Sequence, residues 1–225
     1  MKSTPETGKL IVFDGNDGSG KNTQAQRLRT ELVRRGKGVM LIDFPGYNRT
    51  IFGRLLEEAR MGKLGDFSKT DPYLASLPYA LDRWASKKQI ARALGRGEYV
   101  VCDRYTSANQ IHQGGKIQDE GARIAFLEWI EKVEYEVLGI PIPDISIHLE
   151  VSVELSESNM SDKPRDELEK NLDYLRNSHK TARWLTTQRP DSWITIRCGD
   201  GFGEMRSREV IHQDVVRALE EKGVL

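Results

Sequence analysis

A glycine-rich stretch at residues 15–23 carries the residue types that bind phosphate groups. An apolar run at residues 10–13 precedes it, and residues 24–35 follow with apolar residues at helical spacing. This order predicts a buried strand that leads through a turn into a helix. Glycines let backbone N–H groups face a polyphosphate, the helix N-terminus adds partial positive charge, and a lysine can reach the terminal phosphates. We therefore predict a phosphate turn made by Gly15, Asn16, Asp17, Gly18, Ser19, Gly20, Lys21, Asn22 and Thr23.

One position of the phosphate turn departs from the pattern G-x-x-x-x-G-K-[ST], because Asn22 stands where a hydroxyl group would normally ligate Mg²⁺. An amide oxygen could replace that hydroxyl, a water could mediate the contact, or Thr23 could supply a hydroxyl nearby. Phosphate binding is thus better defined than the metal geometry. A glycine-rich turn that binds nothing is the plainer alternative, and the flanking strand and helix argue against it.

Short apolar runs alternate with helical patterns along the rest of the chain. The runs lie at residues 39–42, 99–102, 145–149 and 193–196, and the main helical patterns at residues 51–61, 71–94, 119–138, 166–187 and 204–222. Pro78 should kink the second of these helices or begin it anew. The alternation indicates an α/β fold with a doubly wound, five-stranded parallel sheet and helices on both faces.

Polar residues follow three of the predicted strands, at Asp14-Gly15, Asp43-Phe44 and Asp103-Arg104. In such sheets ligands gather at the carboxyl ends of the strands. We therefore expect these three strand ends to converge on one cleft. The residues alone predict a nucleotide cleft with several cations and do not name the reaction.

The composition is that of a globular chain, since 38% of its 225 residues are hydrophobic and 30% are charged. We expect one domain over residues 1–225 with a mobile insertion. Lys plus Arg and Asp plus Glu both number 34, so no overall charge favours nucleic acid polymers or anionic membranes. Cys102 and Cys198 suit buried thiols in a reducing cytosol. Because no membrane-length apolar run or signal-peptide core occurs, we expect a cytoplasmic location.

Five separated motifs stand in the order, and at about the spacing, found in the thymidylate kinase family, which the chain resembles. They are Asp17-Gly18-Ser19-Gly20-Lys21, Phe44-Pro45, Tyr79-Ala80-Leu81-Asp82-Arg83-Trp84, Asp103-Arg104-Tyr105 and His112-Gln113-Gly114. The resemblance covers the chain from about Lys9 to the last helix. It implies a P-loop nucleotide kinase that transfers the γ-phosphoryl group of ATP to dTMP with Mg²⁺, giving dTDP for dTTP biosynthesis. It also implies a homodimer formed through helices, for which the apolar faces of residues 119–138 or 90–94 could serve.

The resemblance implies catalytic roles for Lys21, Arg104, Asp103 and Arg165. Lys21 would neutralise charge on the donor phosphates, and Arg104 would lie between donor and acceptor phosphates. Asp103 is similar to a metal-water or orienting carboxylate, and with Asn22 it would hold Mg²⁺, directly or through water. A local surface ion pair is the plainer interpretation of Asp103-Arg104.

A short lid at about residues 156–166 would close over ATP in this family and exclude water. Because the phosphate turn contains no arginine, Arg165 is the expected lid cation, ahead of Lys163. The preceding helical stretch carries no basic residue, so a solvated charge at Arg165 is the alternative.

For the acceptor nucleotide, the resemblance implies contacts from several elements. Asp17 would contact the sugar hydroxyl, unless it only forms the turn. Tyr79 and Arg83 share one helix face, where the ring would stack on the pyrimidine and the guanidinium would bond a base oxygen. Tyr105 could limit room at the sugar. His112 and Gln113 would line the base or ribose pocket, or would only satisfy loop hydrogen bonds. Phe44 and Arg49 are the remaining candidates.

Arg49 is a candidate because Tyr47 stands where the family often places an arginine for the acceptor phosphate. Arg49 could reach the same phosphate if the loop bulges.

Two alternatives to a dTMP kinase stay open. One is a kinase of the same fold that prefers another deoxynucleotide or a deoxynucleoside. The other is a non-catalytic nucleotide-binding module, which Asn22, Tyr47 and the short lid favour.

Overall fold

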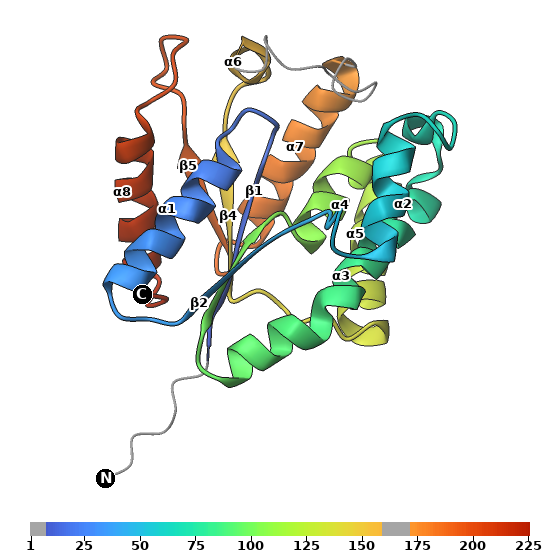
Figure 1. Ribbon diagram of the computed structural model, residues 1–225. Coiled ribbons are helices and arrows are strands. Elements are labelled where there is room, and N and C mark those ends of the chain that lie inside the picture. Colours follow the sequence, from blue (N-terminus) through green and yellow to red (C-terminus); the bar gives the residue numbers. More distant parts are fainter. Residues whose placement is uncertain (1–7, 159–171) are drawn as a thin grey trace.

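Five parallel strands form the centre of the protein in the computed structural model, which describes residues 8–158 and 172–225 (Figure 1). The order across the sheet is β2-β3-β1-β4-β5. The strands are β1 (Leu10–Gly15), β2 (Val39–Asp43), β3 (Tyr99–Asp103), β4 (Ile145–Glu150) and β5 (Trp193–Arg197). The prediction of a five-stranded parallel sheet is confirmed.

The central strand β1 is buried along its whole length, as expected for a parallel strand with helices on both faces. It pairs with β3, where Phe13 lies opposite Asp103, and with β4, where Gly15 lies opposite Leu149. This register brings the ends of β1, β3 and β4 to one edge of the sheet. The phosphate turn therefore begins beside the segments that follow β3 and β4.

Helices connect the strands, and most of them match the predicted patterns. They are α1 (Lys21–Arg34), α2 (Ile51–Arg60), α3 (Pro72–Gly95), α4 (Thr106–Gly114), α5 (Glu120–Glu131), α6 (Val153–Ser158), α7 (Leu172–Gln188) and α8 (Arg208–Glu221), with a 3-10 turn η1 (Phe67–Lys69) and a π-helical segment η2 (Lys132–Val137). α3 continues through Pro78 rather than beginning anew.

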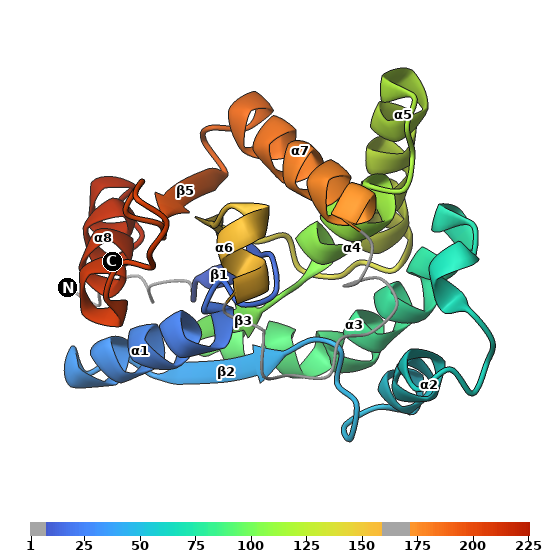
Figure 2. The same ribbon diagram turned by 90° about the horizontal axis from the view of Figure 1, so that it is seen from above.

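The helices lie on both faces of the sheet (Figure 2). On one face, α1 and α8 bury Leu28 and Val215 against inward-facing residues of β1 and β4. On the other, α3 packs Ile90 against Val12 and Cys102. A third cluster joins α4, α5 and α7 to β5. Each large apolar side chain buried in these clusters contributes about 1.5–3 kcal/mol of transfer free energy to folding. The clusters thereby stabilise the sheet edge that carries the site.

The structure differs from the predicted elements at two places. The last helix begins at Arg208 rather than at residue 204, because Gly201 and Gly203 have positive φ angles and Ser207 caps the helix by accepting a hydrogen bond from the Val210 N–H at 3.2 Å. The helix predicted over residues 119–138 changes to a π-helix after Glu131. Cys102 and Cys198 are free and buried, as predicted.

The two faces suggested for a dimer contact are used inside the chain. Phe126, Leu127 and Ile130 of α5 are buried in the third core cluster, and Ile90 is buried against the sheet. Helical periodicity cannot distinguish an intramolecular face from an intermolecular one, because both are apolar stripes. Within residues 8–158 and 172–225, no helix has the length and apolar character needed to span a bilayer.

Candidate active site

The phosphate turn requires glycine at the positions where its backbone bends. Gly15, Gly18 and Gly20 have φ angles of 146°, 79° and 88°, which side-chain-bearing residues rarely adopt. A Cβ atom on Gly15 would lie 2.6 Å from the Leu149 carbonyl oxygen of β4. The pattern read from the sequence therefore reflects both backbone conformation and close packing against the neighbouring strand.

Lys21 lies at the first position of α1 and turns back over the phosphate turn. Its Nζ donates to the carbonyl oxygens of Gly15 at 3.0 Å and Asn16 at 2.8 Å, and lies 3.4 Å from the Asp17 carboxylate. Burial and the Arg104 charge lower the pKa of the Lys21 ammonium, and Asp17 opposes this change. The cation is therefore held in place by groups of the turn that it would serve.

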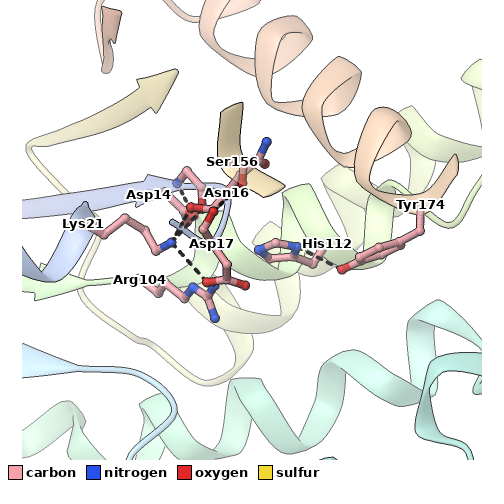
Figure 3. Close-up of polar contacts among 9 residues, drawn as sticks. Asp14, Asn16, Asp17, Lys21, Arg104, His112, Ser156 and Tyr174 are labelled. Carbon is pink, nitrogen blue, oxygen red and sulfur yellow. Dashed lines mark hydrogen bonds and ion pairs between the residues drawn. The ribbon is translucent and has the colours of Figure 1, made fainter. Parts of the chain in front are cut away.

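Arg104 forms an ion pair with Asp17 across the edge of the sheet (Figure 3). Burial by itself would raise the pKa of the Asp17 carboxyl, but Arg104, Lys21 and His112 hold it well below its usual range. Asp17 is thus ionised and bridges two cations from different strand ends. Arg104 has a φ angle of 64°, and its N–H donates to the Phe13 carbonyl at 2.8 Å. A non-glycine residue in this conformation costs about 1–2 kcal/mol, which the surrounding contacts must offset.

Asp103 and Asn22 lie together beside Lys21. Burial raises the pKa of the Asp103 carboxyl, while Lys21, Arg104 and the Asn22 side chain lower it. Asn22 therefore contacts the carboxylate predicted to act with the metal. No cluster of three or more His, Cys, Asp or Glu side chains suited to a metal occurs among the described residues.

A cavity of about 520 Å³ opens next to the phosphate turn. This volume lies within the roughly 300–1,000 Å³ typical of small-molecule sites. Its lining includes the predicted site residues Asn16, Asp17, Phe44, Tyr79, Arg83, Arg104, His112 and Gln113. Arg104 therefore contacts the phosphate turn through Asp17 and also faces the cavity.

Arg83 is almost fully buried and forms a paired contact with Glu134 of η2. Arg83 Nε and Nη2 each donate to the Glu134 carboxylate at 2.6 Å. The Glu134 carboxylate also accepts from Thr106 Oγ1 at 2.8 Å and Asn109 Nδ2 at 3.0 Å. The same carboxylate therefore joins α3, α4 and η2 at the wall of the cavity.

His112 projects from α4 into the cavity and meets α7 on its far side (Figure 3). Its Nδ1 lies 2.9 Å from the Tyr174 hydroxyl oxygen. Burial lowers the pKa of His112 to about 4, with a smaller contribution from Arg104. The imidazole is neutral at physiological pH, and its buried Nε2 has no hydrogen-bond partner among the described residues.

Tyr79 lies on α3, and its ring centroid is 6.4 Å from that of Phe67. Both rings line the cavity, so a flat ligand ring could contact them. The Oε1 atom of Gln113 is also buried without a hydrogen-bond partner among the described residues. Base stacking by Tyr79 and the base or ribose contacts of His112 and Gln113 stay predictions.

Two of the residues predicted to contact the acceptor do not line the cavity. Arg49 folds back on the end of β2, where Nη1 donates to Asp43 at 2.9 Å and the guanidinium lies 5.3 Å from the centre of the Phe44 ring. The Tyr105 ring is fully buried and packs edge to face on Phe44, with its hydroxyl donating to the Pro141 carbonyl at 3.0 Å. Tyr105 therefore packs behind Phe44 rather than lining the cavity, and its role at the sugar stays a prediction. Arg165 and Lys163 lie outside the described residues.

Three residues of the site were missed from the sequence. Glu134 could have been noticed, because it falls four positions after Ile130 on an otherwise apolar helical face. Asp82 accepts a hydrogen bond from the Gly46 N–H at 2.7 Å and another from Thr50, and so holds the loop after β2 against α3. Asn109 lines the cavity. Asp82 stands inside one of the quoted motifs but was given no role there, and for Asn109 no local signal distinguishes a site residue from a surface polar residue.

A strand, a glycine-rich turn and a helix in this arrangement form the phosphate-binding unit of P-loop proteins. The adjoining cavity, with an arginine between it and the turn, places the chain in the class of P-loop nucleotide kinases.

Comparisons with known proteins narrow this class. The family model described as "Thymidylate kinase" matches residues 13–208. The chain is 30% identical over 223 residues to a probable thymidylate kinase from Pyrococcus abyssi, covering 96% of this chain and 97% of that protein. It is 35% identical over 169 residues to the thymidylate kinase of Nitrosospira multiformis, covering 74% and 77%. A solved thymidylate kinase structure from Candida albicans shares the fold with a TM-score of 0.74, at 21% identity over 97% and 93% of the two chains.

The chain belongs to the thymidylate kinase family, as the separated motifs indicated.

We predict that Glu134→Ala lowers the free energy of unfolding by about 3–5 kcal/mol, because it leaves the buried Arg83 guanidinium without its counter-ion. Denaturant unfolding with intrinsic fluorescence measures this change. Glu136→Ala, two residues away and exposed, is the matched control and should stay within about 0.5 kcal/mol of the parent chain. Equal effects of the two substitutions would contradict the role given to Glu134.

We also predict that acid weakens the fold through buried histidines. Burial lowers the pKa of His112 and of His148 to about 4, from the usual 6.5 of a solvated imidazole. As pH falls from 6.5 towards 4, the unfolded chain takes up protons that the folded chain does not, so stability decreases over this window. Between pH 7 and 5.5 each histidine should lower the free energy of unfolding by about 1 kcal/mol.

His148→Gln should therefore reduce the difference in stability between pH 7 and 5.5 by about 1 kcal/mol in denaturant unfolding. His212→Gln is the comparison, because His212 is only partly buried and should change that difference less. A His148→Gln chain with the pH dependence of the parent would refute the prediction.

Proposed function

We propose that this chain transfers the γ-phosphoryl group of ATP to dTMP, giving ADP and dTDP. The thymidylate kinase family model over residues 13–208 supports both the donor and the acceptor. The observation that carries the proposal is that Arg104 joins the phosphate turn and the adjoining cavity, so that a donor and an acceptor phosphate could meet at its guanidinium.

Phosphoryl transfer needs positioning and charge neutralisation more than covalent chemistry. Backbone N–H groups of the phosphate turn would hold the donor polyphosphate, with Lys21 exchanging its contacts to loop carbonyls for phosphate oxygens. Arg104 would exchange its Asp17 contact for oxygens of the transferred group. Asp17, freed in part, would accept from the acceptor's sugar hydroxyl.

Mg²⁺ is part of the proposal, and the donor set at the turn fits it. Mg²⁺ usually keeps several waters and takes one or two carboxylates together with substrate phosphates, so a dedicated protein cage is not required. Asp103 and Asn22 supply side-chain oxygens that lie together beside Lys21. When bound, the ion would neutralise charge on the phosphate oxygens.

For the acceptor, we propose that the base lies between Tyr79 and the α4 wall, where Arg83, Asn109 and Gln113 carry polar groups. Phe44 and His112 would contact the nucleotide, while Arg49 would reach the phosphate only after releasing Asp43. Arg165 stays our choice for the lid cation. We further propose that residues 1–225 form one domain, with a lid at about residues 156–166. The location that we propose for the protein is the cytoplasm.

Purified protein with ATP, Mg²⁺ and dTMP should form ADP and dTDP, measured by chromatography, and EDTA should stop the reaction. Lys21→Ala should lower kcat by about 10²–10³, by analogy with loss of one preorganised charge-stabilising group. Lys88→Ala, an exposed lysine of α3, is the control and should keep parental kcat.

The assay separates the alternatives. Faster turnover of another deoxynucleotide or a deoxynucleoside than of dTMP, ranked by kcat/KM, would replace dTMP as the acceptor. ATP binding without turnover of any acceptor would indicate a non-catalytic module.

We also propose that the protein is a homodimer, as the family resemblance implies, and that an exposed face of α3 forms the contact. Leu74, Leu77 and Trp84 are exposed apolar residues on this helix, at 63%, 36% and 45%. Their spacing of three and seven places them along one side. Exposed apolar side chains gathered on one side of a helix are typical of a surface that another protein covers, and here a second copy would cover them.

Sedimentation should therefore give a dimer mass for the parent chain and a monomer mass for Trp84→Glu. Phe202→Glu is the control, because Phe202 is 94% exposed in the loop before α8 and should leave the mass unchanged. A parent chain that sediments as a monomer at tens of micromolar would reject the dimer without affecting the proposed reaction.

A further inference from the structure

The short helix α6 touches the phosphate turn from the side opposite Arg104. The Ser156 hydroxyl of α6 donates a hydrogen bond to the Asp17 backbone carbonyl (Figure 3). Ser156 is 3% exposed, so water does not compete strongly for this contact. The contact joins positions 139 residues apart in the chain.

The sheet brings these two segments together. Gly15 pairs with Leu149 in the register of β1 and β4, so the chain after β4 passes beside the turn after β1. Ser152 begins α6, where its Oγ accepts from the Leu155 N–H at 3.2 Å. Leu155 is buried in the core beneath α6, in the same apolar cluster as Cys198. α6 is therefore fixed at its base, and Ser156 is held towards the turn.

Three successive carbonyl groups of the turn are held by donors. Lys21 Nζ binds the carbonyl oxygens of Gly15 and Asn16, and Ser156 binds that of Asp17. The C=O and N–H bonds of a trans peptide unit point in opposite directions. A carbonyl of Asp17 directed at α6 therefore directs the Gly18 N–H away from α6.

The peptide unit between Asp17 and Gly18 needs such a contact, because Gly18 has a φ angle of 79° and no side chain to restrict rotation. Phosphate binding by a glycine-rich turn depends on N–H groups that converge before the ligand arrives. Preorganised donors bind more tightly because the ordering cost is already met in the free protein.

We propose that Ser156 is a positioning residue for the donor polyphosphate: its hydroxyl fixes the Asp17–Gly18 peptide unit so that the Gly18 N–H faces the bound phosphates. This inference rests on the proposed ATP site. It gives the beginning of the predicted lid region a role in shaping the phosphate turn, independent of any cation that follows it.

The test is calorimetric binding of ADP and, separately, of dTMP to the full chain. Ser156→Ala should weaken ADP binding by about two- to tenfold, the range for one net hydrogen bond, and leave dTMP binding within twofold. Ser156→Thr, which keeps the hydroxyl, should bind ADP more tightly than Ser156→Ala. A merely structural role would weaken both ligands together.

Ser207→Ala is the matched control. It removes a hydroxyl that caps another helix, α8, without contacting the turn or α6, so ADP binding should stay within twofold of the parent. The inference is overturned if Ser156→Ala binds ADP like the parent chain, if it weakens ADP and dTMP equally, or if Ser207→Ala weakens ADP as much. A parent chain that binds ADP but does not phosphorylate dTMP would overturn the proposed reaction and leave this inference standing.

Discussion

The ion pair between Asp17 and Arg104 joins the two parts of the site. Asp17 belongs to the turn after β1 and Arg104 to the end of β3, and these strands are neighbours in register. The cations Lys21 and Arg104 and the anion Asp17 lie together in a small, largely buried volume. The two cations keep the Asp17 carboxyl ionised. A phosphate entering this volume would replace the carboxylate as the partner of both cations. The site is thus arranged around an internal anion, the Asp17 carboxylate.

Around this centre, buried acceptor groups fix the walls. Glu134 gathers donors from α3 and α4, and Asp82 holds the loop after β2 against α3. Such contacts position side chains more narrowly than apolar packing does, because hydrogen bonds are directional. The cavity and the phosphate turn are held in place by different groups. Buried carboxylates position the walls of the cavity, whereas Lys21 and Ser156 donate hydrogen bonds to the backbone carbonyl groups of the phosphate turn.

Local patterns predicted much of this arrangement, and their failures have physical causes. The alternation of apolar runs and helices gave five strands in parallel, because burial on both faces leaves a continuous apolar run. The motifs placed Asp17, Arg104, Tyr79 and His112 at one cavity. Tyr105 and Arg49 do not line the cavity, because their neighbours in the sequence do not determine whether a side chain turns into the core or back onto its own strand. The start of α8 depended on a capping contact that several polar residues could have made.

The sequence by itself determined the family, the five strands and the phosphate turn, since these depend on short motifs, on their order along the chain and on periodicity. Only the tertiary structure decided which distant partners complete the site. The pairing of Arg83 with Glu134, of His112 with Tyr174 and of Ser156 with the Asp17 carbonyl each joins separate elements. The physical reason is that a hydrogen bond is set by distance and direction in space, and many polar residues could satisfy the same donor until the fold brings one of them within reach.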